Sequence, residues 1–214
     1  TGELLVDHYL VMDPMQRGGE IPGIPTKEPT FGLPAWWVAA GDRDQVELAG
    51  FTVVDCSTVL VTHLTEIVKR HAHELLGRQE VKELLDVVKE KNPVVVEELV
   101  PELLAMGEVQ KILQNLLRER VPVRDLATIL EALADGARLS KDTDYLTETA
   151  RQALARTICR QYAGPGAKIT AITLHPKLEQ IISDSIEQTQ VGSYPVLEPH
   201  LARQVLNKLK DLVE

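Results

Sequence analysis

Three histidines and several carboxylates lie close together in residues 62–80, THLTEIVKRHAHELLGRQE, and such side chains could bind a metal ion or transfer protons. On an ideal helix, which turns about 100° per residue, His63 and His73 share one face and His71 lies on the opposite flank. His63 and His73 are also about 15 Å apart along the axis, at about 1.5 Å per residue. Zinc holds its nitrogen ligands at about 2.0–2.1 Å, and paired helical ligands are spaced i, i+4, as in H-E-x-x-H. The sequence therefore predicts no metal site here.

The same stretch fits a helix that packs against other parts of the protein. Glu66 and Arg70 share a face with His63 and His73, and their i,i+4 spacing predicts a surface ion pair. His71 is expected to be an interior or interface histidine with one hydrogen-bond partner, because its flank is apolar. The apolar residues of that flank are Leu60, Leu64, Ile67, Val68 and Leu75. This helix is therefore predicted to be structural.

The composition limits the classes of protein to which the chain can belong. A length of 214 residues with 44% apolar content is enough for two or three small cored units. The net charge of −9 disfavours a nucleic-acid binder and favours basic protein partners. Cys56 and Cys159 are far apart in the sequence, which favours a reducing cytoplasmic setting over secretion. Cys56 and His63 would be two helical turns apart, too far for a nucleophile and its base, so we predict no catalytic residue and no cofactor.

The N-terminal residues have the pattern of a small α/β unit. The chain starts at Thr1 without a methionine, in a strand-like segment, and we interpret it as a fragment. No apolar run approaches the ~20 residues that cross a bilayer, and no signal peptide is present. The predicted elements are a strand over residues 4–13, a loop rich in Gly and Pro over 14–34, a strand that includes Trp36–Val38, a helix over 41–50 and a strand over 51–55.

Residues 57–162 have a helical pattern. Gly77 is predicted to end the first helix, a second helix runs from Gln79 to Lys91, and Pro93 suits the first turn of a third. Apolar residues at positions i, i+3, i+4, i+7 and i+8 predict two more amphipathic helices, which a short linker makes neighbours in space. The apolar residues that define these two helices are Val109, Ile112, Leu113, Leu116 and Leu117, and then Leu126, Ile129, Leu130 and Leu133.

The C-terminal residues predict a last α/β unit that is incomplete. A turn at residues 164–166 leads to a predicted strand over 168–174, a helix around 176–186 and a final helix over 199–214. The string GPGAK is a turn rather than a phosphate loop, because it precedes a strand and lacks the G-x-x-x-x-G-K-[ST] spacing. The predicted fold class is α+β and predominantly helical, with a small α/β subdomain, a central helical subdomain and a partial C-terminal α/β subdomain.

The two helices around residues 115–130 could form a helix-turn-helix. Basic side chains gather there, at Lys111, Arg118, Arg120 and Arg124. Reading bases requires polar side chains on the recognition helix, whereas the second helix offers mostly Ala, Leu, Thr and Glu. A cytoplasmic helix-turn-helix regulator is kept as the alternative from another class, and an enzyme is the third interpretation.

The stretch EPTFGLPAWW concentrates aromatic side chains on a loop. Prolines on both sides of Phe31 remove backbone donors and stiffen the chain. Rigid loops that carry aromatic residues can present a binding anchor at low entropic cost. Phe31, Trp36 and Trp37 could also serve a core, and residue chemistry alone leaves both interpretations open while favouring the core.

Several longer strings resemble one protein family. They are EPTFGLPAWWV, GFTVVDCSTVLVTHLTEIVKRHAHELLGRQEV, LVPELL, VQKILQNLLRERVPVRDLATILEALAD and LTETARQALARTI. Together they resemble the cytoplasmic region of the FlhA family (FHIPEP), the export-gate proteins of flagellar and virulence type III secretion, through most of residues 5–175. The strings HAHELLGRQE and LVPELL favour a flagellar member, with an injectisome export-gate homologue as the alternative.

The resemblance implies a docking platform for protein export and no enzyme activity. Members of the family follow a membrane-embedded N-terminal half, lie at the cytoplasmic face of the bacterial inner membrane and form a nonameric ring in the full-length protein. The implied partners are export chaperone–cargo complexes, components of the export ATPase complex and other export-gate membrane proteins. No cofactor, metal or nucleic acid is implied.

The family layout also implies subdomain limits and a partner-binding site. Residues 1–55 resemble the second subdomain, 56–76 a helix of the interrupted first subdomain, 77–155 the helical third subdomain and 156–214 part of the fourth. In the family a hydrophobic dimple between the first and second subdomains receives chaperones, and the matching positions are Glu28, Phe31 and Thr62. Glu28 is expected as a charge at the rim, Phe31 as the apolar anchor and Thr62 at the start of the following helix. Most of the first subdomain and the end of the fourth are expected to lie outside this chain.

Overall fold

An antiparallel four-stranded sheet begins the chain in the computed structural model, which describes residues 4–15, 18, 21–189 and 192–213. The strand order β2-β3-β1-β4 places β1 between β3 and β4. The strands are β1 His8–Met12, β2 Ile24–Lys27, β3 Pro34–Ala39 and β4 Thr52–Asp55. A 3-10 turn, Ala40–Asp42, and the short helix α1, Arg43–Leu48, connect β3 to β4. We call residues 4–55 the sheet unit; all its elements except β2 were predicted.

The sheet unit has an apolar cluster on each face. Successive side chains of a strand point to opposite faces, so neighbouring residues of β1 and β3 enter different clusters. One cluster contains Leu10, Ala35 and Trp37 and is completed by Val59 from the next helix. The other contains Val11 and Val38 and is completed by Val46 of α1. Each face of this small sheet is therefore covered by one helix.

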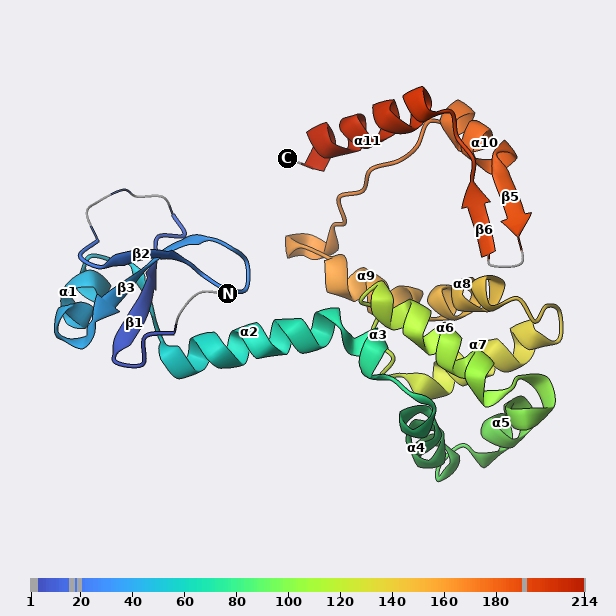
Figure 1. The fold of residues 1–214 in the computed structure, drawn as a ribbon. Coiled ribbons are helices and arrows are strands. Elements are labelled where there is room, and N and C mark those ends of the chain that lie inside the picture. Colours follow the sequence, from blue (N-terminus) through green and yellow to red (C-terminus); the bar gives the residue numbers. More distant parts are fainter. Residues whose placement is uncertain (1–3, 16–17, 19–20, 190–191, 214) are drawn as a thin grey trace.

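Helix α2, Cys56–Arg70, leads from the sheet unit to the rest of the chain (Figure 1). Asp55 caps its N-terminus, because the carboxylate accepts a hydrogen bond from the Thr58 N–H at 2.9 Å. The helix breaks at His71, whose φ and ψ are −106° and 15°, and a single turn, α3 Ala72–Leu75, follows. Gly77 begins the next helix as its N-cap instead of ending the first one, so the predicted end at Gly77 is wrong.

The ion pair predicted on this stretch is also wrong, and the burial of His71 differs from the prediction. Glu66 does not pair with Arg70; its Oε1 lies 2.7 Å from Nη2 of Arg120, far away in the sequence. His71 is exposed rather than interior in this chain, because the apolar flank that was expected to surround it, including Leu64 and Val68, is itself exposed. The prediction of one hydrogen-bond partner is met by Glu74, whose Oε1 lies 2.7 Å from His71 Nδ1.

The helical core follows, and we use this name for residues 76–162. Its elements are α4 Arg78–Lys89, α5 Pro93–Glu98, a π-helical turn Leu99–Leu103, α6 Met106–Arg118, α7 Leu126–Ala137, α8 Thr143–Ala153 and α9 Ala155–Tyr162. Pro93 occupies the first turn of α5, as predicted. The apolar faces predicted for α6 and α7 form the centre of this core, with Leu146, Ala150 and Leu154 of the following segment packed against them.

The C-terminal unit, residues 163–213, contains helix α10 Pro176–Asp184, the hairpin β5 Ile186–Thr189 and β6 Gly192–Pro195, and helix α11 Pro199–Val213. Both helices were predicted and the hairpin was not. The predicted strand over residues 168–174 is wrong, because no described strand pairs with this segment and a strand requires a hydrogen-bonded neighbour. None of the side chains described in this unit is fully buried. The predicted fold class, α+β and predominantly helical, is confirmed.

Candidate functional site

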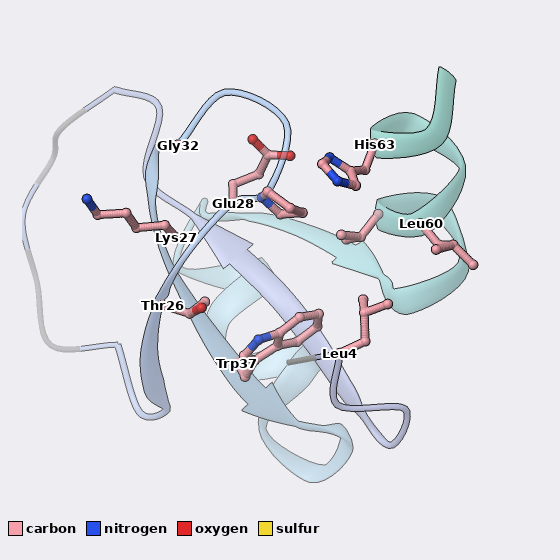
Figure 2. Close-up of a pocket in the computed structure, with 10 residues that line it drawn as sticks. Leu4, Thr26, Lys27, Glu28, Gly32, Trp37, Leu60 and His63 are labelled. Carbon is pink, nitrogen blue, oxygen red and sulfur yellow. The ribbon is translucent and has the colours of Figure 1, made fainter. Parts of the chain in front are cut away.

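A cavity of about 510 Å³ lies between the sheet unit and the first turns of α2 (Figure 2). Its apolar wall is formed by Leu4, Trp37, Val59 and Leu60. Its polar wall is formed by Thr26, Lys27, Glu28 and His63, and Figure 2 shows the His63 ring directed toward the Glu28–Pro29 segment. Such a mixture of apolar area and a few convergent polar groups is typical of a binding site.

Glu28 organises the loop that connects β2 to β3. Its carboxylate accepts hydrogen bonds from the backbone N–H groups of Thr30, at 2.8 Å, and Phe31, at 2.6 Å. Its own backbone bonds with Leu33 and Gly32 close the same loop at 2.8 and 2.9 Å. Glu28 is only 6% exposed, so the expectation of a charge at the rim is wrong. The side chain lies inside the loop because its oxygens satisfy N–H groups that the turn leaves without partners.

The carboxyl group of Glu28 remains charged in this position. Burial raises its pKa, but the hydrogen bonds from Phe31 and Thr30, together with the nearby His63, outweigh burial and hold the pKa of Glu28 below its usual value. A charged carboxylate is a stronger acceptor than a neutral one. The loop that carries Phe31 is therefore fixed by a charge-assisted turn.

The lowered pKa of Glu28 predicts the pH dependence of the loop. A depressed pKa stabilises the fold at pH values above the unfolded pKa, and this contribution is lost as the pH falls through the folded pKa. We expect amide protection of Thr30 and Phe31, measured by NMR, to be high at about pH 6 and to drop below about pH 4. Glu28→Gln is expected to lower protection at about pH 6 and to remove the dependence on pH, whereas Glu47→Gln on the exposed face of α1 serves as the matched control. Equal protection of the parent loop at pH 6 and pH 3 would contradict this role.

Phe31 lies at the tip of this loop and is 70% exposed. The sequence leaves open whether these aromatic residues serve a core or a binding surface. The core interpretation is wrong for Phe31, because its side chain is exposed; Trp37 is buried in the sheet unit instead, and Trp36 is half-buried. Pro29 and Gly32, on either side of Phe31, line the cavity. The ring therefore stands in solvent beside the cavity, on a loop whose shape is set by Glu28.

The structure brings the three predicted site residues to one region in different ways. Glu28 lines the cavity, whereas Phe31 and Thr62 each adjoin a residue that does, Gly32 and His63. Thr62 is exposed in the second turn of α2 rather than at its start. Sequence reasoning missed the contributions of Val59, Leu60 and His63. Their spacing places all three on one side of α2, and this signal could have identified that side as a wall of the site.

Neither a metal centre nor a membrane-spanning helix is found in the part of the chain that the structure describes. No group of three or more metal-binding side chains converges there. No helix in the described residues combines enough length with enough apolar character to cross a membrane. Both cysteines, Cys56 and Cys159, are free thiols.

Comparison with known proteins identifies the family. The model of the FHIPEP family matches residues 1–214, the whole chain. The chain belongs to the FHIPEP family. The flagellar biosynthesis protein FlhA of Bacillus subtilis is 46% identical over 208 residues, which cover 97% of this chain and 31% of that protein. FlhA of Escherichia coli is 38% identical over 211 residues, 99% of this chain and 30% of that protein. The chain thus spans about 30% of these FHIPEP relatives.

Solved structures of FHIPEP-like proteins have the same fold. The Chlamydia pneumoniae CdsV protein aligns with a TM-score of 0.86 at 29% identity, over 98% of this chain and 61% of that one. The nonameric SctV-C from EPEC aligns with a TM-score of 0.72 at 27% identity, over 97% of this chain and 63% of that one. The EscV cytosolic domain from the type III secretion system aligns with a TM-score of 0.72 at 26% identity, over 99% of this chain and 64% of that one. The fold and family predicted from the sequence are therefore confirmed.

Proposed function

We propose that this chain is part of the docking platform of the flagellar type III export gate and that export chaperone–cargo complexes bind at the cavity beside Phe31. One observation carries the proposal: a loop held by the buried carboxylate of Glu28 presents an exposed aromatic ring next to an apolar cavity. Exposed aromatic anchors on rigid loops are typical of protein-binding sites, because little entropy is lost when they bind.

The cavity is suited to binding rather than to catalysis. Its ionisable side chains are Lys27, Glu28 and His63. The carboxylate of Glu28 accepts hydrogen bonds from two backbone N–H groups of its own loop, which gives it a structural role. The family consists of export-gate proteins, and we propose that this chain likewise has no enzyme activity.

We propose the subdomain limits implied by the family layout: residues 1–55, 56–76, 77–155 and 156–214. Helix α2 supports a separate assignment for 56–76, because its apolar side chains Leu60, Val61 and Leu64 are exposed. An apolar helix stripe of this kind is normally buried against another element. In a protein as long as the FlhA relatives, a first subdomain from outside residues 1–214 would cover it. The dimple would then lie between that subdomain and the sheet unit.

Assembly and location follow the same family. Two of the solved neighbours are a nonameric SctV-C and a complex of CdsV with CdsO. We propose that the full-length protein forms a ring at the cytoplasmic face of the inner membrane and contacts components of the export ATPase complex and other export-gate membrane proteins. A flagellar role is favoured over an injectisome role, because identity is 46% to FlhA of Bacillus subtilis and 26% to the EscV cytosolic domain of a type III secretion system.

The helix-turn-helix alternative finds little support. Helix α7 would be the recognition helix, yet its residues Leu126, Ile129, Leu130 and Leu133 are buried in the helical core. A recognition helix must expose polar side chains to the major groove. The net charge of −9 also opposes contact with phosphates.

Calorimetric titration tests the proposal. The complete protein is titrated with a chaperone–cargo complex of the same flagellar system. We expect a saturable heat of binding, with one complex bound per protein chain. The control replaces residues 29–33 with a Gly-Ser loop of equal length, which should abolish that heat while circular dichroism stays the same. Failure of the intact protein to bind any such complex, or undiminished binding by the loop variant, would overturn the proposal.

A further inference from the structure

Arg120 occupies a backbone conformation that favours glycine. It follows α6 with φ of 60°, and the Arg120 N–H donates to the Leu117 carbonyl at 3.0 Å while the Val121 N–H donates to the Leu116 carbonyl at 2.9 Å. This pair of bonds is the Schellman ending of a helix, in which the left-handed position is usually glycine. A residue with a Cβ is strained there, so an arginine at this position indicates that its side chain has a use.

The side chain of Arg120 reaches helix α2. Its Nη2 lies 2.7 Å from Oε1 of Glu66, and the Glu66 side chain is only 17% exposed. Partial burial weakens the screening of an ion pair by water. Water therefore screens this pair less than it screens the exposed pairs on single helices, such as Arg43 with Glu47.

The backbone of Arg120 is held from the other side by helix α9. Gln161 donates a hydrogen bond from Nε2 to the Arg120 carbonyl at 3.3 Å. The strained residue is thus fixed by α6, by α9 and by its own ion pair. Strain of this kind persists only where surrounding contacts determine the conformation.

The ion pair spans a pivot between α2 and the helical core. Helix α2 ends at Arg70 and the chain changes direction at His71. On the core side, Gln110 and Gln114 of α6 both donate to the Leu76 carbonyl, at 3.0 and 2.9 Å, and so fix the end of the pivot. Glu66 lies on the α2 side of this pivot and Arg120 on the core side. A contact across a pivot sets the angle between the two bodies.

We propose that Arg120 is a latch that fixes the direction of α2, and with it the position of the sheet unit, relative to the helical core. When the pair with Glu66 is intact, α2 is held at one angle; when it is broken, α2 swings about His71. Helix α2 has 15 residues and is about 22 Å long, so a swing of about 15° moves its far end by roughly 6 Å. This inference concerns the geometry of the chain and holds whether or not the cavity binds a chaperone.

Distance measurements between spin labels test the latch in the complete protein. Labels are placed on exposed positions of the two bodies, at Gln45 of α1 and Glu131 of α7, with Cys56 and Cys159 replaced by serine and with unlabelled protein in excess. The variant Arg120→Gly removes the latch and also relieves the backbone strain, so it is expected to remain folded. Glu66→Gln removes the pair from the other side. Arg118→Gln is the matched control, because it alters an exposed arginine at the end of α6 that donates a hydrogen bond to Asn115 Oδ1 of the same helix.

We expect both latch variants to broaden the distance distribution relative to the parent protein, and Arg118→Gln to leave it unchanged. The charge-swapped double variant, Glu66→Arg with Arg120→Glu, should restore the narrow distribution. An unchanged distribution in both single variants would overturn the latch. An equal broadening in Arg118→Gln, or no recovery in the swap, would show that loss of this ion pair is not the cause and would overturn it as well.

Discussion

Replacing Phe31 with alanine is expected to lower the affinity for a chaperone–cargo complex by about 30-fold or more and to leave thermal unfolding unchanged. Truncation of a buried aromatic anchor typically costs about 2 kcal/mol or more of binding free energy, and 1.4 kcal/mol corresponds to about tenfold. Phe31 contributes little to folding because 70% of it is exposed. A core phenylalanine would instead cost about 3–5 kcal/mol of stability.

The measurement is calorimetric titration of the complete protein, paired with a thermal melt of each variant. Leu48→Ala on α1 is the control, because Leu48 is also an exposed apolar residue of the sheet unit but lies outside the cavity lining. If Glu28 were a charge at the rim, as the sequence predicted, Glu28→Ala would lower the affinity less than Phe31→Ala. Since Glu28 is buried and orders the loop, we expect Glu28→Ala to weaken binding as well, through a loop that must be ordered on docking. Unchanged affinity in a folded Phe31→Ala protein would refute the assignment of Phe31 as the anchor.

Leu130→Ala is expected to have the largest effect on stability, a loss of about 2–5 kcal/mol in the free energy of unfolding. Leu130 of α7 is fully buried in the helical core. Removing its side chain loses apolar burial and leaves a cavity that close-packed neighbours fill only in part.

Urea unfolding followed by circular dichroism measures this loss. The control is Leu139→Ala, since Leu139 lies just beyond α7 and is exposed. Surface changes of this kind usually stay within about 0.5 kcal/mol. A loss for Leu130→Ala no larger than that of Leu139→Ala would mean that the helical core is not packed as described.

The helices could be predicted because their signal is local. The apolar spacing of α6 and α7 and Pro93 at the start of α5 need only a few neighbouring residues. Strand β2 and the β5–β6 hairpin were missed because a strand is defined by its partner, which may come from anywhere in the chain. The opposite error occurred at residues 168–174, where the composition predicted a strand but no described strand pairs with the segment.

The side-chain contacts show the same division. The i,i+4 spacing of Glu66 and Arg70 allows an ion pair within one helix. In the structure Glu66 pairs instead with Arg120, which lies just after the end of another helix. Glu28 was placed at a rim because charged residues are usually exposed; its burial depends on a loop that closes around its own carboxylate. Phe31, Trp36 and Trp37 look alike in sequence. The strand alternation of β3 places Trp37 in one apolar cluster and Trp36 against the other, whereas Phe31 lies in the loop before β3.

Val59 determines where the sheet unit can be separated from the rest of the chain. This residue belongs to α2, yet it completes the apolar cluster of Leu10, Ala35 and Trp37 on one face of the sheet. A polypeptide cut after Asp55 would leave that face bare to water, and exposed apolar faces favour self-association. The unit that can be excised and transplanted therefore ends beyond the first turns of α2, so that the limit of this module lies inside a helix rather than in a loop.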